Sequence, residues 1–309
     1  MTPAARPRKR DRRYWLRLLR LFVVALVVAL VVPPLASGAT SIYALTHSFC
    51  AQGATPADFN PHYEDITLPS THDLELAGYF IPGDNRAALI IPPASNGGRG
   101  ASMHYARMFN QAGFSVLMFE SRTCTRQGWY SLGYQEVDDV EAAYHYLLTR
   151  PEVDPNRIGL HGFSSAGATS LMAMARLPEI RSVSAEGGYH DYAALLGTPG
   201  AGTYFETLYR LSFIVTYRLI TGTDIQNLSP MNAIPVIAPR PILLVYGSRE
   251  VTLKGAEQML ERAIESGSPA ELWIVPGADH GQYLSLAPEG FVQRVVGFHQ
   301  AALLGSTGS

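Results

Sequence analysis

Cysteine is scarce in this sequence, with Cys50 and Cys124 the two in 309 residues. Because they lie far apart in the chain, no CxxC motif of a zinc or redox site occurs, and a disulfide-dense mini-fold is excluded. Charged residues make up 16% of the chain and hydrophobic residues 47%, with 28 glycines and 21 prolines. This composition excludes wholesale disorder and collagen-like repetition and is typical of an ordered globular protein.

Basic residues are also scarce outside one short segment. Residues 1–20 hold eight basic side chains and one acidic side chain, a net charge of +7. The remainder carries 16 basic and 25 acidic groups, a net charge of −9. A body of that charge repels phosphate, so we expect no nucleic-acid partner.

A single long apolar run follows the basic residues. Residues 21–45 carry no charge, and Leu21–Val32 is wholly apolar. Hydrocarbon about 30 Å thick needs roughly 20 apolar residues of helix, so the run predicts a transmembrane helix in contact with the lipid bilayer. The pair Pro33 and Pro34 is expected to kink or end this helix. Two hypotheses stay open: a retained signal anchor, which the length of the run favours, and a signal peptide cleaved near residues 36–39.

The topology follows from the charge asymmetry, because basic flanks of a membrane helix stay in the cytoplasm. We expect a single-pass protein of the cell membrane with its domain outside the cytoplasm, or a secreted domain if the signal is cleaved. The expected divisions are a basic tail with signal anchor (1–45), a juxtamembrane linker (46–62), the folded domain (63–304) and a disordered tail (305–309).

The expected compartment bears on the two cysteines. In an oxidising space a pair of cysteines is more often bonded than free, so we predict a disulfide between Cys50 and Cys124. Two unpaired thiols are the alternative.

From residue 63 the pattern alternates strands with helices. Residues 63–69 and 74–81 are expected to form a hairpin. Further strands are expected at 87–91, 115–120, 158–161, 183–186, 242–246 and 272–275, and helices at 103–111, 137–148, 166–177, 254–266 and 288–304. Strands separated by helices of this length pair in parallel through right-handed crossovers, which predicts a doubly wound, mostly parallel α/β sheet.

Residues 191–238 interrupt this alternation with segments rich in tyrosine, phenylalanine and leucine. We interpret them as a helical lid inserted over the carboxyl edge of the sheet. Three roles for its apolar side chains stay open: packing onto the sheet, lining an acyl pocket, or touching the bilayer.

A candidate nucleophile lies where the strand at 158–161 runs into a helix. A serine hydroxyl held on a tight strand–turn–helix bend needs small residues two positions before and after it. Gly162 and Ala166 meet that need around Ser164. Ser165 fails the same test, because Phe163 would occupy its small position.

A serine nucleophile needs a base, and the base needs an orienting carboxylate. Glu250 and His280 each follow the carboxyl end of a predicted parallel strand, where such sheets build their sites. The chain order Ser164, Glu250, His280 is that of hydrolases on this kind of sheet. Asp279 is an alternative acid, but side chains of adjacent residues seldom face each other.

Residues 63–304 resemble the α/β-hydrolase superfamily, especially a bacterial membrane-anchored branch that is similar to serine aminopeptidases, monoacylglycerol lipases and dipeptidyl-peptidase-like hydrolases. The stretches that carry the resemblance are Tyr63–Gly83, Arg157–Gly167, Ser229–Glu250 and Gly277–Gly281. The resemblance implies a Ser–acid–His hydrolase of esters, amides or lipids, without a metal or organic cofactor.

Three positions depart from the family's pattern. Pro92-Pro93-Ala94-Ser95 replaces the usual His-Gly after the third strand, Glu250 stands where Asp is usual, and Glu120–Cys124 replaces a glycine-containing motif after the fourth strand. The oxyanion of an acyl intermediate normally takes one backbone N–H from the first of these loops and one from the residue after the nucleophile. Ser165 supplies the second donor. Because proline has no N–H, Ala94 or Ser95 must supply the first.

The leading hypothesis is an extracytoplasmic serine hydrolase that cleaves a small-molecule or short-peptide acyl ester or amide through Ser164, His280 and Glu250. A serine exopeptidase is one alternative, for which Glu186 and Asp191 are candidates to recognise an amine. A binding or scaffold module that kept the fold without turnover is the other, favoured by the two prolines of the oxyanion loop.

Overall fold

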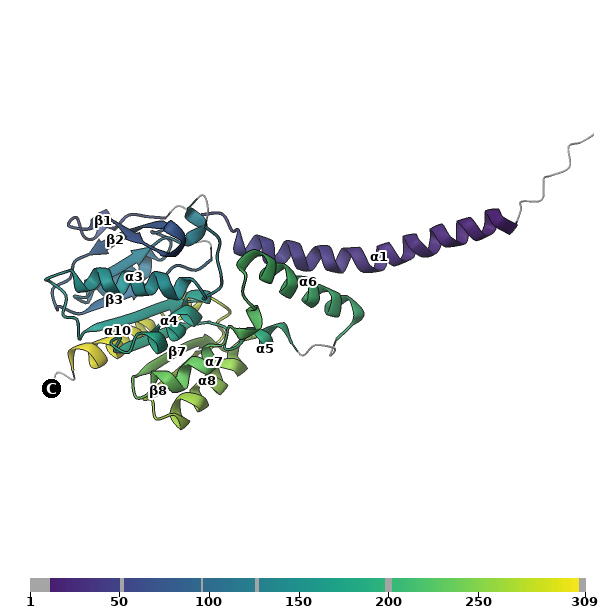
Figure 1. Ribbon diagram of the computed structural model, residues 1–309. Helices are drawn as coiled ribbons and strands as arrows, with labels where there is room; N and C mark the ends of the chain where they lie inside the picture. The colour runs from purple at the N-terminus through teal and green to yellow at the C-terminus, as the bar shows by residue number, and fades with distance from the viewer. Residues whose placement is uncertain (1–11, 51–52, 96, 126–127, 198–201, 306–309) are drawn as a thin grey trace, which may run out of the picture. The chain divides into compact units, whose positions relative to one another are not determined.

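The computed structural model describes residues 12–50, 53–95, 97–125, 128–197 and 202–305 (Figure 1). The predictions made for residues 1–11 and 306–309 lie outside these residues. The described chain divides into two compact units. One joins residues 12–43 with 202–223, and the other, the hydrolase body, joins residues 44–197 with 224–305.

The hydrolase body is built on an eight-stranded sheet. Its strands are β1 (Glu64–Pro69), β2 (Glu75–Ile81), β3 (Ala88–Ile91), β4 (Ser115–Phe119), β5 (Ile158–Phe163), β6 (Ser182–Glu186), β7 (Ile242–Gly247) and β8 (Ala270–Val275). Their spatial order is β1-β2-β4-β3-β5-β6-β7-β8. β1 pairs antiparallel with β2, β2 antiparallel with β4, and every other neighbouring pair is parallel. The predicted hairpin and the mostly parallel α/β class are confirmed.

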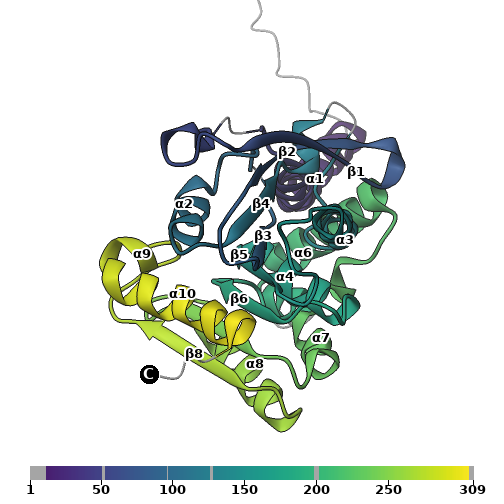
Figure 2. The ribbon, with the colours of Figure 1, turned by 90° about the vertical axis from the view of Figure 1, so that its left-hand side faces the viewer.

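Helices cover both faces of this sheet (Figure 2). One face carries α3 (Glu136–Leu148), α4 (Ser165–Arg176), α7 (Pro230–Ile237) and α8 (Leu253–Glu265), and the other carries α2 (Met103–Gln111), α9 (Tyr283–Leu286) and α10 (Pro288–Leu304). Short 3-10 turns occur at Pro56–Asp58, Thr71–Asp73, Arg122–Cys124 and Ile225–Asn227. Successive strand residues alternate between the two cores, with Ile90 in one and Leu89 in the other, as period-two side chains require.

Residues 191–238 contain α5 (Tyr192–Leu196), α6 (Tyr204–Thr221) and α7. Ile234 and Ile237 of α7 are fully buried in the core beside α4, so α7 is part of the hydrolase body. α6 instead belongs to the unit that contains the N-terminal helix. The segment is therefore divided between the two units, and a lid role stays a prediction.

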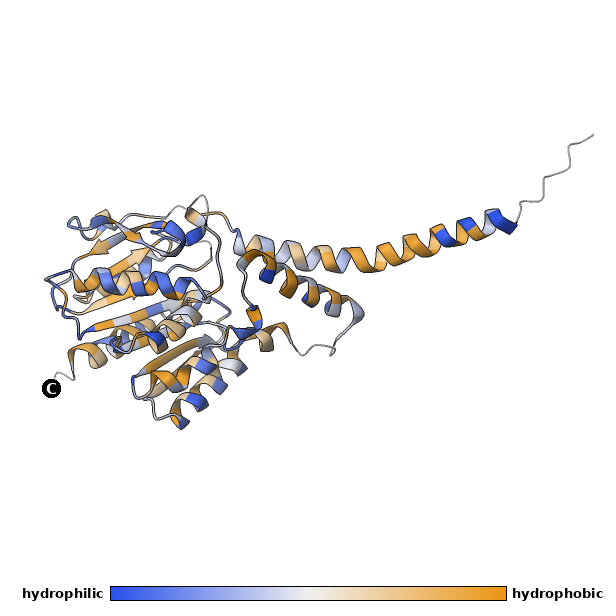
Figure 3. Ribbon diagram, viewed as in Figure 1, coloured by the Kyte–Doolittle hydropathy of each residue, from blue (hydrophilic) through white to orange (hydrophobic). Residues whose placement is uncertain are grey.

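The N-terminal helix α1 (Arg12–Thr46) has a mean hydropathy of 2.6 over its most apolar window and is long and apolar enough to cross a membrane (Figure 3). It continues through Pro33 and Pro34 rather than ending there. Proline's fixed φ is compatible with a helix, and its cost is the lost N–H donor. The hydrogen bonds just beyond the prolines involve other carbonyls: Ser212 Oγ donates to the Leu35 carbonyl (2.6 Å) and Thr40 Oγ1 to the Ala36 carbonyl (2.8 Å).

Candidate active site

Ser164 lies on the bend between β5 and α4. Its backbone has φ 57° and ψ −129°, a strained conformation for a residue with a side chain. The strain is held by the surroundings: the Ser164 N–H donates to the Glu186 carbonyl at 2.7 Å. A Cβ on Gly162 would lie 2.3 Å from the Ala166 carbonyl oxygen, so a glycine is required there. The bend thus raises the serine hydroxyl above the carboxyl edge of the sheet.

The structure brings Ser164, His280 and Glu250 into one hydrogen-bonded row. His280 Nε2 lies 3.0 Å from Ser164 Oγ, and His280 Nδ1 lies 2.8 Å from Glu250 Oε1. Both distances are within hydrogen-bond reach, the geometry that a base between a nucleophile and an orienting acid requires. The His280 side chain is 48% exposed and the Glu250 side chain 2% exposed. The imidazole therefore faces solvent, while the carboxylate is enclosed.

Tyr283 is a partner of Glu250 that the sequence did not indicate. Its hydroxyl donates to Glu250 Oε1, the oxygen that also faces His280. Burial and the neighbouring carboxylate raise the pKa of Tyr283, which keeps the hydroxyl protonated as a donor. A Cβ on Gly187 would lie 2.4 Å from the Tyr283 hydroxyl and 2.8 Å from His280 Nδ1, so Gly187 leaves room for both rings.

The alternative acids have other partners. The Asp191 carboxylate accepts the Ala194 N–H and caps α5. The Asp279 N–H donates to the Gln282 side chain, and no described hydrogen bond joins either aspartate to His280. Among the described contacts, Glu250 is the carboxylate that orients the imidazole.

The sequence predicted oxyanion donors at Ser165 and at Ala94 or Ser95, and these residues differ in how near they lie to Ser164. Ser165 begins α4, and its hydroxyl accepts a hydrogen bond from Tyr130 at 2.9 Å. Ser95 lines the same pocket as Ser164, Ser165 and His280, whereas Ala94 is not among the lining residues. Ser95 is therefore the better placed of the two loop candidates.

The loop that carries Ser95 is fastened to the turn after β4. The Ser95 carbonyl accepts hydrogen bonds from the hydroxyls of Ser48, Ser121 (3.2 Å) and Thr123 (3.1 Å). The Ser121 N–H donates to the Gly97 carbonyl at 2.7 Å. Hydroxyl and amide donors from two distant segments thus hold the Ser95 loop in place.

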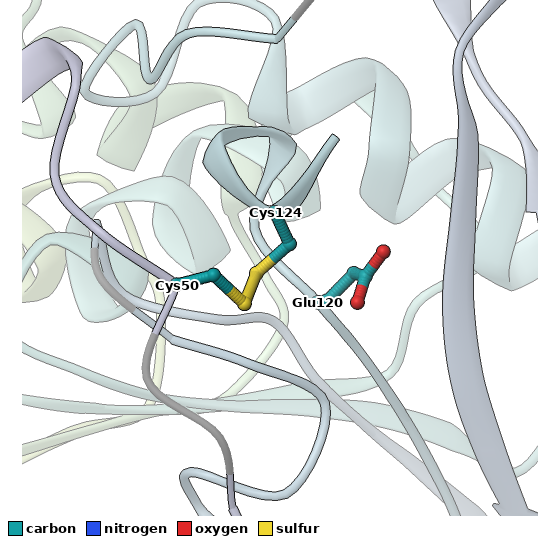
Figure 4. A group of neighbouring side chains, drawn as sticks. All are labelled: Cys50, Glu120 and Cys124. Atoms are coloured by element: carbon teal, nitrogen blue, oxygen red, sulfur yellow. A yellow bond between two sulfur atoms is a disulfide. The ribbon is translucent and has the colours of Figure 1, made fainter. Parts of the chain in front are cut away.

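The same turn carries Cys124, which is joined to Cys50 by a disulfide with Cα atoms 4.8 Å apart (Figure 4). Glu120 lies beside this bond, and within the described residues these three side chains come nearest to a metal-ligand set. A bonded sulfur is not the thiolate that ligates metals, so the group does not fit a metal site. The bond ties the segment after α1 to the turn that braces Ser95.

Arg122 anchors the turn after β4 through its side chain, a role that the sequence did not indicate. Its side chain is fully buried, and its guanidinium binds both carboxylate oxygens of Asp139 at 2.7 and 2.8 Å. It also donates to Gln135 Oε1 at 2.6 Å and to Thr71 Oγ1 at 2.8 Å. A bidentate pair with further acceptors fixes the guanidinium plane and hence the turn.

The pocket at Ser164 has a volume of about 230 Å³. Its non-catalytic walls are mainly apolar or aromatic, contributed by Leu45, Leu132, Tyr189, Tyr192 and Leu195. No aspartate or glutamate is among the described residues that line it. A larger hollow of about 510 Å³, between Pro241 and Arg294, includes none of the three catalytic candidates.

Glu186 is buried beneath the site rather than exposed in the pocket. Its Oε2 accepts the Tyr105 hydroxyl at 2.7 Å, and its Oε1 lies 3.3 Å from His161 Nε2. Burial, with a smaller contribution from the Glu250 charge, raises the pKa of Glu186 to about 8. Burial holds the pKa of His161 well below its usual value. The Glu186 side chain is fully buried and is not among the described residues that line the pocket at Ser164, so it is poorly placed to recognise an amine there.

Residues 102–305 match the prolyl oligopeptidase family. The chain belongs to this family. It is an α/β-hydrolase and a serine hydrolase, as the sequence resemblance predicted.

Individual relatives are distant. The chain is 25% identical to the uncharacterized protein YfhR of Escherichia coli over 230 residues, which covers 70% of this chain and 73% of YfhR. It is 24% identical to the acylamino-acid-releasing enzyme of Rattus norvegicus, of which it covers 35%, with 79% of this chain matched. Among solved structures, an esterase of Pyrococcus furiosus is similar, with a TM-score of 0.66, 21% identity, and coverage of 82% of this chain and 98% of the esterase.

Proposed function

We propose that this serine hydrolase cleaves an acyl ester or amide with Ser164 as nucleophile, His280 as base and Glu250 as orienting acid. The hydrogen-bonded row from Ser164 Oγ through His280 to Glu250 is the observation that carries the proposal. His280 Nε2 takes the proton as Ser164 attacks the carbonyl, and then returns it to the leaving group as the acyl-enzyme forms. Water repeats the sequence in the second half, releasing the acid and restoring the serine.

The oxyanion of each tetrahedral intermediate is held by backbone N–H groups in this proposal. The Ser165 N–H at the start of α4 is one donor, and the Ser95 N–H is the other. Donors that are already fixed cost no reorganisation when the charge forms, which is why such groups contribute strongly to acyl transfer. The braces on the Ser95 carbonyl support this role for the loop.

The acyl group is proposed to be uncharged and partly apolar. Aromatic and leucine side chains dominate the pocket walls, and the described lining offers no carboxylate to bind an ammonium group. An exopeptidase that requires a free amino terminus is thus disfavoured. A second candidate, release of an N-acylated residue from a peptide, fits the same neutral pocket and is favoured by the named relative from rat.

Paired substrates test this proposal. We expect the purified full-length chain to hydrolyse a p-nitrophenyl butyrate ester and N-acetyl-alanine p-nitroanilide with higher kcat/KM than alanine p-nitroanilide. The last two differ in the blocked amine alone, so they form a matched control. A preference for the free amine would contradict the neutral pocket.

We also propose that the hydrolase body lies outside the cytoplasm on a membrane anchor formed by α1. The apolar helix and the basic residues that precede the run at residue 21 support this topology. In intact cells, external protease should digest the body while an N-terminal tag stays protected. Protection of the body would overturn the orientation.

A further inference from the structure

Helix α6 is apolar on two neighbouring faces, and α1 covers one of them. Phe213 is buried, and its backbone lies close to Gly38 of α1. A second stripe at helical spacing includes Tyr204, Leu211, Val215 and Leu219, which are exposed, and Leu208, which is half-buried. Leu211 is 53% exposed and Leu219 80% exposed. A helix with a second apolar face needs a second apolar partner.

The contact between α6 and α1 is close and well defined (Figure 1). Ser212 Oγ donates to the Leu35 carbonyl at 2.6 Å. A Cβ on Gly38 would lie 2.2 Å from the Tyr209 carbonyl oxygen, so the glycine lets the two backbones approach. Small residues at such crossings are typical of helices that pack within membranes. These contacts fix the position of α6 along the length of α1, beside Leu35 and Gly38.

The level of that position in the bilayer follows from helix geometry. Hydrocarbon about 30 Å thick takes up roughly 20 residues at about 1.5 Å of rise per residue. Counted from Leu21, the first residue after the last charge of the basic segment, the apolar span ends near Thr40. Leu35 and Gly38, where α6 is attached, therefore fall at the outer end of the span. The apolar stripe of α6 is held beside the outer leaflet.

The polar residues of α6 agree with an interfacial position rather than a second full span. Glu206 and Arg210 lie on the side of the helix away from the apolar stripe, whereas Arg218 flanks the stripe in the last turn. Figure 1 shows α6 running alongside α1. An apolar stripe with charged residues on another side suits a helix that contacts acyl chains along one side. Tyrosines such as Tyr204 are typical of the boundary between headgroups and acyl chains.

We propose that α6 is a second bilayer-contacting helix, with its stripe of Tyr204, Leu208, Leu211, Val215 and Leu219 in the outer leaflet. The occupant of this surface is lipid acyl chain. The inference rests on the proposed membrane anchor and goes beyond it, because a single span needs no second helix at the interface.

Photolabelling from within the bilayer tests the inference on the full-length chain. The protein is reconstituted into phosphatidylcholine nanodiscs that contain a lipid with a diazirine on its acyl chain, and labelled peptides are mapped by mass spectrometry. We expect label in residues 23–32 of α1 and in residues 211–219 of α6. The α8 peptide with Ile264, 60% exposed on the hydrolase body, is the internal control and should stay several-fold lower.

Variants sharpen the result. Leu211→Gln with Leu219→Gln should reduce labelling of α6 several-fold and leave labelling of α1 unchanged, whereas the control Val236→Gln, at an exposed site on α7, should change neither. Label in α1 without label in α6 would overturn the inference and leave the anchor standing. Label in neither would overturn both. A cross-link from α6 to a second copy of the chain, in place of lipid, would also overturn it.

Discussion

The bend at Ser164 and the loop at Ser95 meet at one pocket but are held there by different contacts. The bend is fixed by the small residues Gly162 and Ala166 and by the backbone hydrogen bond from Ser164 to Glu186. The loop at Ser95 is fixed by hydroxyls and a disulfide from segments before and after it. Small neighbouring residues and a backbone hydrogen bond hold the bend, whereas the loop depends on side chains and a disulfide from segments far away in sequence. Distant changes should therefore damage the loop and spare the bend.

Replacing the nucleophile should have the largest effect. Ser164→Ala removes the attacking oxygen, so kcat/KM for an acyl ester should fall on the order of 10⁴–10⁶-fold. Ser165→Ala is the matched control: it keeps the backbone N–H and loses one hydrogen bond from Tyr130, so activity should change far less. Steady-state kinetics on the same ester measures both. Similar losses in the two variants would contradict the assignment of the bend.

Changing the acid should have the next largest effect. Glu250→Gln removes the charge that stabilises the imidazolium, and kcat should fall on the order of 10²–10⁴-fold. Glu250→Asp keeps the charge but retracts it, so its loss should be smaller. Asp279→Asn should leave kcat nearly unchanged. The assignment fails if Asp279→Asn is inactive and Glu250→Gln is active.

Removing the disulfide tests the dependence of the oxyanion loop on distant groups. Cys50→Ser with Cys124→Ser opens a loop with a sequence separation of 74 and should lower the free energy of unfolding by up to about 4 kcal/mol. Because the Ser95 loop loses part of its support, kcat should fall by about tenfold. This fall is smaller than the fall in kcat expected when an oxyanion donor is removed altogether. Kinetics well below the melting temperature of the variant separates the two effects. An unchanged kcat would show that the Ser95 loop keeps its conformation without the disulfide.

The smallest effect on activity, and a clear effect on pH dependence, is expected for Glu186→Gln. The pKa of Glu186 is raised to about 8 in the folded protein, so the folded state binds one more proton than the unfolded state from about pH 4.5 to 8. Its contribution to stability therefore declines as pH rises through that window. Glutamine carries no charge at any pH, so the variant should lose less stability than the wild type between pH 7 and 9. Denaturant unfolding at both pH values measures the difference, and equal slopes would contradict the raised pKa.

The strands and helices of the hydrolase body were predictable because their patterns are local. The helix expected at residues 103–111 has those bounds, and the other regular elements agree to within about two residues at each end. Ser164, Glu250 and His280 could be selected because each follows a recognisable strand in a known order. Tyr283 and Arg122 could not, since their roles depend on partners such as Glu250 and Asp139 that the fold brings near. The division of residues 191–238 between two units also depends on long-range packing, in this case of α6 on α1.

The covalent adduct of a fluorophosphonate probe tests the central claim most directly. The full-length chain is labelled, digested, and the modified residue is located by tandem mass spectrometry. We expect one adduct, on Ser164, absent from Ser164→Ala and formed much more slowly by His280→Ala. An adduct on Ser165, or equal labelling of the wild type and Ser164→Ala, would contradict it.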